Sequence, residues 1–246
     1  MKPLLHVNDP ISGMNDEHQA RLWHLSSSRH YKAGDIVIFQ GRTVSEVYRI
    51  TQGKAKISSY TEDGREIILS NLTPGDIFGD TAMLDGMPSA YNVECLTDCV
   101  VRVLPGDEFT NLFDEYPAYA YELCHKFNRQ VRILYELLVE ARAMPLSKRL
   151  ISILCRGYHT HTGQDQTGRY VDLSQDELAR MLGTARQSLN RELKKLEAAG
   201  YLDIIHGRVY LTHMDKMRAD HKDIIHDNFV TPYKELTDNG SPLQRQ

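Results

Sequence analysis

Long apolar runs, cysteine clusters and secretion signals are all missing from this sequence of 246 residues. No stretch approaches the roughly 18 consecutive apolar residues that a membrane span requires, and the N-terminus lacks the apolar segment of a signal peptide. The four cysteines include no CxxC pair and do not form the even framework of a small secreted domain, so disulfides are not expected. We therefore expect a cytoplasmic protein with no membrane partner and with free, mostly buried thiols.

Basic charge is also scarce, because 29 Lys and Arg residues face 33 Asp and Glu residues and the formal net charge is −4. Any nucleic-acid binding must therefore come from a local patch rather than from the overall charge balance. The sequence has no metal-ligand cluster, no phosphate loop of the Walker type and no nucleophile motif. We predict no catalytic residue and no metal site, and we do not expect an enzyme.

The sequence does contain regularly spaced turn-forming glycines between about Tyr31 and Pro105. Glycines at positions 41, 53, 64 and 75 recur every 11 to 12 residues and separate short β-rich runs. These runs are DIVIF, EVYRI, AKISSY, REIILSNL and CVVRVL. Turn signals at this spacing predict a compact β-sandwich or β-roll. The preceding stretch DEHQARLWHLSSS is predicted to be helical and to pack on this unit.

A second region, between Pro117 and Pro145, has neither glycine nor proline. Its apolar residues recur at steps of four and three: Leu123, Phe127, Val131, Leu134, Leu138 and Ala141. This period predicts one long helix of ~40 Å, which is longer than a small β unit needs to cover itself. We predict that the stripe meets a second copy in a parallel homodimer; the alternative is that it packs on its own β domain. Pro145 and Ser147 end this helix and begin the next, which places a hinge near residues 143–146.

The clearest local signal begins at Ser174. Ser174 and Glu177 have the spacing of a capping box, and Leu173 and Leu178 stand where a hydrophobic staple requires apolar side chains. The helix that starts here, QDELARML, ends at Gly183. A second helix begins at once, with Thr184 as its predicted cap. Two helices joined by a tight glycine turn form a helix-turn-helix.

The second of these helices carries a distinctive polar face. Leu189, Leu193 and Leu196 form its buried stripe, which leaves five polar residues on the opposite side: Arg186, Gln187, Asn190, Arg191 and Lys194. Arginine can donate two hydrogen bonds to guanine, glutamine and asparagine can do the same with adenine, and lysine suits phosphates. The runs YLDII and RVYLT around His206 and Gly207 predict a β-hairpin wing beside the helices.

The segment LSQDELARMLGTARQSLNRELKKLEAAGYLDIIHGRVYL resembles the DNA-binding domain of the CRP/FNR family of bacterial transcription regulators, and the β-roll and long helix match its other parts. The resemblance covers roughly residues 20–215. It implies an α+β fold with a cyclic-nucleotide-binding-type β-roll, a long dimerisation helix and a C-terminal winged helix-turn-helix. We place these parts at residues 1–116, 117–144 and 145–213, followed by a C-terminal extension over residues 214–246.

The same resemblance implies function and partners. The expected protein is a homodimer that reads a palindromic promoter site in double-stranded DNA and contacts RNA polymerase. The DNA-binding residues are expected to be Thr184, Arg186, Gln187, Asn190, Arg191 and Lys194. In the family's cyclic-AMP-dependent members the position of Gln187 is Glu, an acceptor for the cytosine amino group, so the half-site sequence is expected to differ.

The effector site departs from the family pattern. The family's cassette has Gly-Glu, whose carboxylate takes a ribose hydroxyl, followed by Arg-Ser/Thr-Ala, which holds the cyclic phosphate. The corresponding candidate residues here are Gly79, Asp80, Thr81, Ser89 and Ala90. Pro88 replaces the phosphate-binding Arg, which removes both the guanidinium and a backbone donor. Leu134 and Tyr135 stand where cyclic-AMP-dependent members use Thr and Ser to touch adenine, so ordinary cyclic-AMP binding is not expected.

Several effectors remain to be considered. An iron–sulfur sensor needs an N-terminal cysteine cluster, and the first cysteine here is Cys95. Cys95 and Cys99, read on one extended strand, would lie ~13 Å apart and beyond disulfide reach. His159 and His161 are interpreted as solvated loop residues without a third metal ligand. The cofactor is therefore unknown: another nucleotide, such as a cyclic dinucleotide, or no effector at all.

One alternative function stays open at this point. In it the β-roll senses a nucleotide and the helical end serves a protein partner instead of DNA.

The residues after Thr212 are expected to extend beyond the family's usual end, helical to about Phe229 and flexible afterwards.

Overall fold

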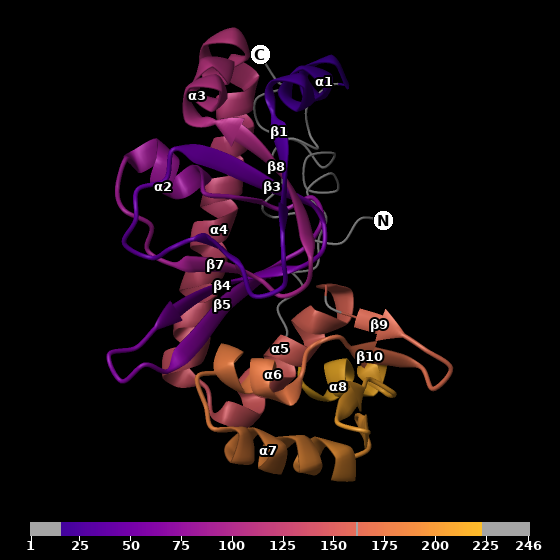
Figure 1. The fold of residues 1–246 in the computed structure, drawn as a ribbon. Helices are drawn as coiled ribbons and strands as arrows, with labels where there is room; N and C mark the ends of the chain where they lie inside the picture. The colour runs from indigo at the N-terminus through magenta and orange to yellow at the C-terminus, as the bar shows by residue number, and fades with distance from the viewer. Residues whose placement is uncertain (1–15, 161, 223–246) are drawn as a thin grey trace, which may run out of the picture. The chain divides into compact units, whose positions relative to one another are not determined.

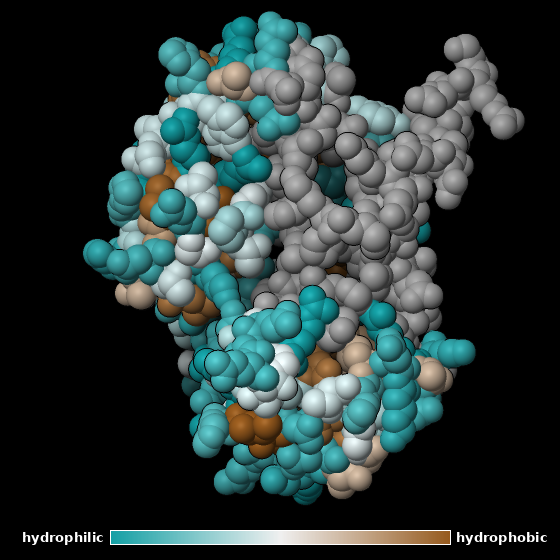
Figure 2. All heavy atoms as spheres, turned by 90° about the vertical axis from the view of Figure 1, so that its right-hand side faces the viewer, coloured by the Kyte–Doolittle hydropathy of each residue, from teal (hydrophilic) through white to brown (hydrophobic). Residues whose placement is uncertain are grey.

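The computed structural model describes residues 16–160 and 162–222, and these residues fall into two compact units (Figure 1). The first unit comprises residues 16–132 and the second comprises residues 133–160 and 162–222. Within these ranges, no helix is long and apolar enough to cross a bilayer. One face of the described surface carries mainly hydrophilic side chains, with hydrophobic ones in small separate groups (Figure 2).

The first unit contains two antiparallel four-stranded sheets, with strand orders β1-β8-β3-β6 and β2-β7-β4-β5. The strands are β1 Ser27–Tyr31, β2 Ile36–Ile38, β3 Glu46–Gln52, β4 Ala55–Tyr60, β5 Glu66–Leu72, β6 Ile77–Phe78, β7 Asn92–Cys95 and β8 Cys99–Pro105. Side chains from both sheets, among them Ile50, Leu72, Val93 and Val101, form one buried core. The predicted β-roll is therefore confirmed, although β1, β6 and β7 were not predicted.

Helices cover the outside of this β-roll. They are α1 Asp16–Leu25, α2 Asp80–Asp85, α3 Gly106–Glu115 and the first part of α4 Pro117–Ala143. A second core joins them to the sheet, with Leu22 of α1 and Leu112 of α3 packed against Leu104. The expected N-terminal helix is present but ends earlier than predicted. Its serine run instead opens β1, where Ser27 pairs with Val103 because β8 offers a free edge there.

The cysteine pair of the β-roll corrects one prediction. Cys95 ends β7 and Cys99 begins β8, so the chain turns between them and the assumed separation along one strand is wrong. The Cys99 thiol donates to the Lys54 carbonyl over 3.2 Å. Burial, followed by the Cys99 contact, raises the pKa of Cys95 to about 12. The prediction of free and mostly buried thiols is confirmed, with Cys124 exposed.

The apolar stripe of α4 divides into two parts. Leu123 is buried and Phe127 is half-buried against the core of the β-roll, as the alternative interpretation of this helix expected. Farther along, Val131, Leu134 and Leu138 are 47%, 62% and 45% exposed. Tyr135 and Val139 are exposed beside them. The C-terminal half of the stripe therefore presents an uncovered apolar surface within the single chain.

The junction after α4 lies where the hinge was predicted. Helix α4 ends at Ala143, and α5 Leu146–Thr160 begins directly after Pro145. The carboxylate of Glu140, which is largely buried, accepts from Ser152 over 2.8 Å and from two nitrogens of Arg156 over 2.7 and 3.1 Å. Two helices that meet at a proline are thus held by a bidentate charged network.

The second unit combines helices with a small sheet. Its elements after α5 are β9 Thr162–Gln164, β10 Arg169–Val171, α6 Gln175–Met181, α7 Arg186–Ala198, β11 Asp203–Ile205, β12 Arg208–Tyr210 and α8 Met214–Asp220. The strand order is β11-β12-β10-β9, and only β11 and β12 were predicted. The core includes Leu154, Leu178, Leu193 and Met217.

Two predictions in this unit need revision. Helix α5 continues to Thr160, so His159 lies in its last turn and not in a loop; His161 lies outside the described residues. The apolar residues Leu150 and Leu154 of this helix face the core of the unit. The first part of the C-terminal extension is helical, but α8 spans only Met214–Asp220 and ends before the expected Phe229; Met214 and Met217 are buried. The tail after residue 222 lies outside the described residues.

Candidate nucleic-acid interface

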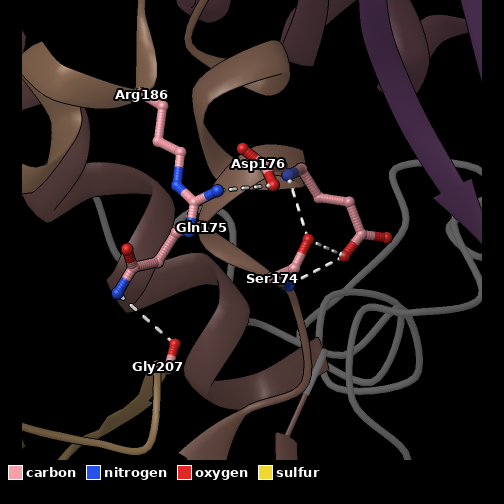
Figure 3. Close-up of polar contacts among 6 residues, drawn as sticks. Ser174, Gln175, Asp176, Arg186 and Gly207 are labelled. Carbon is pink, nitrogen blue, oxygen red and sulfur yellow. Dashed lines mark hydrogen bonds and ion pairs between the residues drawn. The ribbon is translucent and has the colours of Figure 1, made fainter.

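The start of α6 has the predicted capping box (Figure 3). The Glu177 amide donates to Ser174 Oγ over 3.2 Å, and the Ser174 amide donates to Glu177 Oε2 over 2.7 Å. Leu173 and Leu178 are both buried beneath this end, as the predicted staple requires. Reciprocal capping provides hydrogen-bond acceptors for backbone amides that the helix itself cannot pair. Helix α6 therefore has a defined start, with Ser174 as its N-cap residue.

The turn between α6 and α7 is closed by backbone hydrogen bonds. Gly183 has a φ of +60°, a left-handed conformation that favours glycine. The Thr184 amide donates to the Ala179 carbonyl over 3.0 Å, so Thr184 belongs to the C-terminal turn of α6. The prediction that Thr184 caps α7 is therefore wrong: Ala185 is the N-cap residue, and it makes no side-chain cap.

Helix α7 presents the polar face that the sequence predicted. Leu189 and Leu193 are fully buried and Leu196 nearly so. On the opposite side four of the predicted residues are exposed, namely Arg186, Gln187, Arg191 and Lys194, while Asn190 and Thr184 are half-buried. The helix therefore offers guanidinium, amide and ammonium groups on one surface, the set of donors that base edges and phosphates accept.

Two of these side chains have partners that the sequence analysis missed. Arg186 Nη1 lies 3.2 Å from Asp176 Oδ2, and the two side chains are 61% and 49% exposed (Figure 3). Lys194 Nζ lies 3.4 Å from Glu197. The sequence shows Asp176 in the first turn of α6, but it does not show that Asp176 lies next to Arg186. Exposed ion pairs of this kind contribute at most about 1 kcal/mol, so they leave both cations available to a stronger partner.

The predicted wing is confirmed as the hairpin of β11 and β12. His206 and Gly207 form its two-residue turn with φ values of +50° and +80°, as a turn matched to strand twist requires. Gln175 Nε2 donates to the Gly207 carbonyl over 3.4 Å and so connects the wing to the start of α6 (Figure 3). Near the other end, Asp165 accepts from the Tyr210 hydroxyl over 2.8 Å, which lowers the pKa of that carboxyl.

Replacing Ser174 with alanine is expected to lower the free energy of unfolding of the second unit by about 1 kcal/mol, the usual contribution of an N-cap side chain. Urea unfolding followed by circular dichroism measures this loss. Trp23, the sole tryptophan, belongs to the first unit, so its fluorescence midpoint should not change. Ser174→Thr keeps the hydroxyl and should retain most of the stability; a loss as large as that of alanine would contradict the capping role.

The candidate effector residues lie in the β-roll, and two of them, Asp80 and Ser89, already have partners within the chain. Asp80 opens α2, is buried, and forms an ion pair with Lys126 of α4. The amide of Ser89, also buried, donates to the Arg42 carbonyl over 2.9 Å, and its hydroxyl donates to the Tyr91 carbonyl over 2.8 Å. These residues do not fit a cyclic nucleotide held in the family's usual manner.

The remaining candidate effector residues include no charged group that could pair with a phosphate. Gly79 is buried with a φ of +85°, whereas Thr81 and Ala90 are exposed. Leu134 and Tyr135, at the adenine positions, are 62% and 67% exposed. Across residues 16–160 and 162–222, no three His, Cys, Asp or Glu side chains gather as metal ligands would.

Comparisons with known proteins agree with this architecture. Residues 28–116 match the cyclic nucleotide-binding domain family, and residues 148–220 match the Crp-like helix-turn-helix domain family. The second match includes α8 and so runs past residue 213, where the sequence analysis ended the winged domain.

Individual relatives point the same way. The chain is 27% identical over 188 residues to the transcriptional regulator LdrP of Thermus thermophilus, covering 74% of this chain and 91% of the relative. It is 26% identical over 204 residues to the cAMP-activated global transcriptional regulator Vfr of Pseudomonas aeruginosa, covering 76% and 92%. The structure of the c-di-GMP responsive global regulator CLP of Xanthomonas campestris has the same fold, with a TM-score of 0.70, 20% identity, and coverage of 80% and 99%. The chain belongs to the CRP/FNR family of DNA-binding transcription regulators.

Proposed function

We propose that this protein is a homodimeric transcription regulator that reads a palindromic promoter site by inserting α7 into the major groove. The observation that carries this proposal is the exposed polar face of α7, held by a capped α6 on one side and a hydrogen-bonded wing on the other. A solvated surface helix needs no such surroundings, whereas a recognition helix must be positioned to within a hydrogen-bond length.

Each residue of the face has a role that follows from its chemistry. Arg186 and Arg191 can each donate two hydrogen bonds to a guanine, and Gln187 and Asn190 can do the same with an adenine. Lys194 on the face and Thr184 in the turn before α7 suit phosphate oxygens, which position the helix but do not select sequence. Because Gln187 offers an amide and not a carboxylate, we expect a half-site that differs from one read by Glu at this position.

The dimer is supported by the uncovered half of the α4 stripe. Leu134, Tyr135, Leu138 and Val139 form an apolar surface on a helix that has already covered its own β-roll with its first half. Contiguous exposed apolar patches mark interaction sites, and a parallel partner helix would pair identical residues. Two recognition helices could then occupy half-sites ~34 Å apart, one turn of DNA.

Further roles follow from the family. RNA polymerase is the proposed second partner, because relatives such as Vfr are named transcriptional regulators. Because chromosomal DNA is the proposed ligand, we propose a cytoplasmic location for the protein. The relatives are regulators, and we propose no catalytic activity and no metal for this chain.

Selection of bound fragments from the source genome by the purified protein tests the proposal. The enriched fragments should share a palindrome whose half-sites lie one helical turn apart, and gel shifts should confirm the affinity. The gel shifts are repeated in the presence of cyclic AMP and of cyclic di-GMP. Enrichment of no common sequence would contradict the proposed function.

A further inference from the structure

We propose that the effector position of the β-roll is filled from within, by the ammonium group of Lys126, and that DNA binding by this regulator does not depend on a cyclic nucleotide. The part of this inference that concerns DNA rests on the proposed function. The part that concerns nucleotide binding stands alone. Both rest on one buried ion pair and on the hydrogen bonds around Ser89.

The ion pair joins two helices that are distant in the sequence. Asp80 is the first residue of α2 and Lys126 lies in the middle of α4, and the side chains are 2% and 3% exposed. A buried charge without a partner is strongly unfavourable, so each of these groups requires the other in this fold. In cyclic-nucleotide-binding relatives the acid at this position takes the ribose hydroxyl. Here its oxygen accepts from the chain's own cation.

The phosphate side of the cassette is occupied in the same way. The Ser89 amide donates to Arg42 and its hydroxyl donates to Tyr91, so both of its hydrogens have acceptors within the chain. Pro88 has no amide hydrogen. A phosphate would meet neither a guanidinium nor a free backbone donor at these residues.

A nucleotide could enter only at a high cost. Its ribose would have to displace Lys126 from Asp80, which would leave an ammonium group buried without its anion. The internal pair already does what an effector would do at this place, because it connects α2 of the cassette to α4. We therefore expect the fold to hold this connection permanently.

Direct titration tests the first half of the inference without DNA. Isothermal titration calorimetry of the full chain with cyclic AMP, cyclic GMP and cyclic di-GMP should show no binding. A dissociation constant below about 1 mM for any of them would overturn the inference. In fluorescence anisotropy with the selected site, the same nucleotides should change the DNA affinity of the wild-type protein less than twofold, and a tenfold gain would equally overturn it.

Variants of the pair test the second half. Lys126→Met removes the ammonium with little change of shape, and Asp80→Asn neutralises the anion with almost none. Each should weaken DNA binding by roughly 5-fold to 150-fold, the usual range of coupling between sites. The double variant should lose no more than the worse single variant, because the pair acts as a unit. Wild-type DNA affinity in a folded Lys126→Met protein would refute the coupling.

A matched control separates this effect from the loss of any lysine. Lys32 pairs with Asp98 over 2.7 Å on the surface of the same β-roll, and the side chains are 81% and 65% exposed. Lys32→Met should therefore bind DNA as the wild type does. If Lys126→Met fails to fold, the Asp80→Asn variant and the wild-type titrations still decide the question. Failure of the proposed function itself would appear differently, as absence of DNA binding by the wild type.

Discussion

Replacing Arg191 with alanine is expected to lower the affinity of the protein for its selected DNA site by at least tenfold and to relax base preference at one position of each half-site. A bidentate arginine–guanine contact contributes about 1–3 kcal/mol of discrimination, and a dimer makes the contact twice. Two losses of 1–3 kcal/mol correspond to roughly 30-fold to 10⁴-fold in affinity. Fluorescence anisotropy with the selected site and with single-base variants measures both effects.

Arg186→Ala should behave similarly but lose slightly less. Arg186 must give up its contact with Asp176 to bind a base, and that exposed pair is worth at most about 1 kcal/mol, less than the guanine contact that replaces it. The difference between the two arginines should shrink in an Asp176→Asn background. Salt dependence adds a second readout, since loss of a phosphate contact by Lys194→Ala should lower the salt slope while leaving base preference intact.

The control for these variants is Arg21→Ala. Arg21 is also exposed, pairs with Glu115, and belongs to the β-roll unit. Its removal should leave DNA affinity within twofold of the wild type. If Arg186, Gln187 and Arg191 could all become alanine without loss of DNA affinity, α7 would not be the reading helix, and the protein-partner alternative would be favoured.

Local signals in the sequence were enough to predict the DNA-binding end of the molecule. The capping box at Ser174, the glycine turn at Gly183 and the wing turn at His206 and Gly207 each depend on residues within a few positions of one another. Such features are encoded by neighbours, so their geometry could be derived before any fold was known. Thr184 shows the limit, because whether it caps α7 or closes α6 depends on one backbone hydrogen bond.

Features that depend on distant partners could not be predicted in this way. No pattern near Asp80 indicates that its partner is Lys126, 46 residues later, and nothing near Glu140 identifies Arg156 across the proline junction. Strand β7 was missed because its sequence, NVEC, is short and its stability comes from pairing with β2 and β4. Cys95 and Cys99 approach each other only because a turn separates the two strands. Tertiary contacts decide these positions, and local propensity does not.

The long helix α4 depends both on local sequence and on contacts with distant residues. Its period of four and three predicts the helix correctly, but the stripe has two destinations that the period cannot distinguish. Leu123 meets the β-roll because α3 and α1 present apolar side chains there. Leu134 and Leu138 belong to the second unit, and they are exposed in the single chain. The sequence shows an apolar stripe; only the fold shows which half of it remains for a partner.

Replacing both Leu134 and Leu138 with glutamate is therefore expected to convert the proposed dimer into a monomer. The two side chains are 62% and 45% exposed, so the single chain should fold normally with glutamate at these positions. In a parallel dimer, however, each glutamate would face an identical charge in an apolar contact. Size-exclusion chromatography with light scattering should report half the mass, and circular dichroism should be unchanged.

DNA binding should fall together with the dimer. A dimer binds its second half-site as an intramolecular event, which strengthens binding by roughly 100-fold to 10⁴-fold without any new contact. The monomeric variant should lose that factor on a palindromic site but bind an isolated half-site as the wild-type subunit does. Leu69→Glu is the matched control, because Leu69 is 51% exposed on β5 and lies outside the stripe. If the Leu134→Glu/Leu138→Glu protein remained dimeric, the interface would have to lie elsewhere, and the uncovered half of α4 would need another partner.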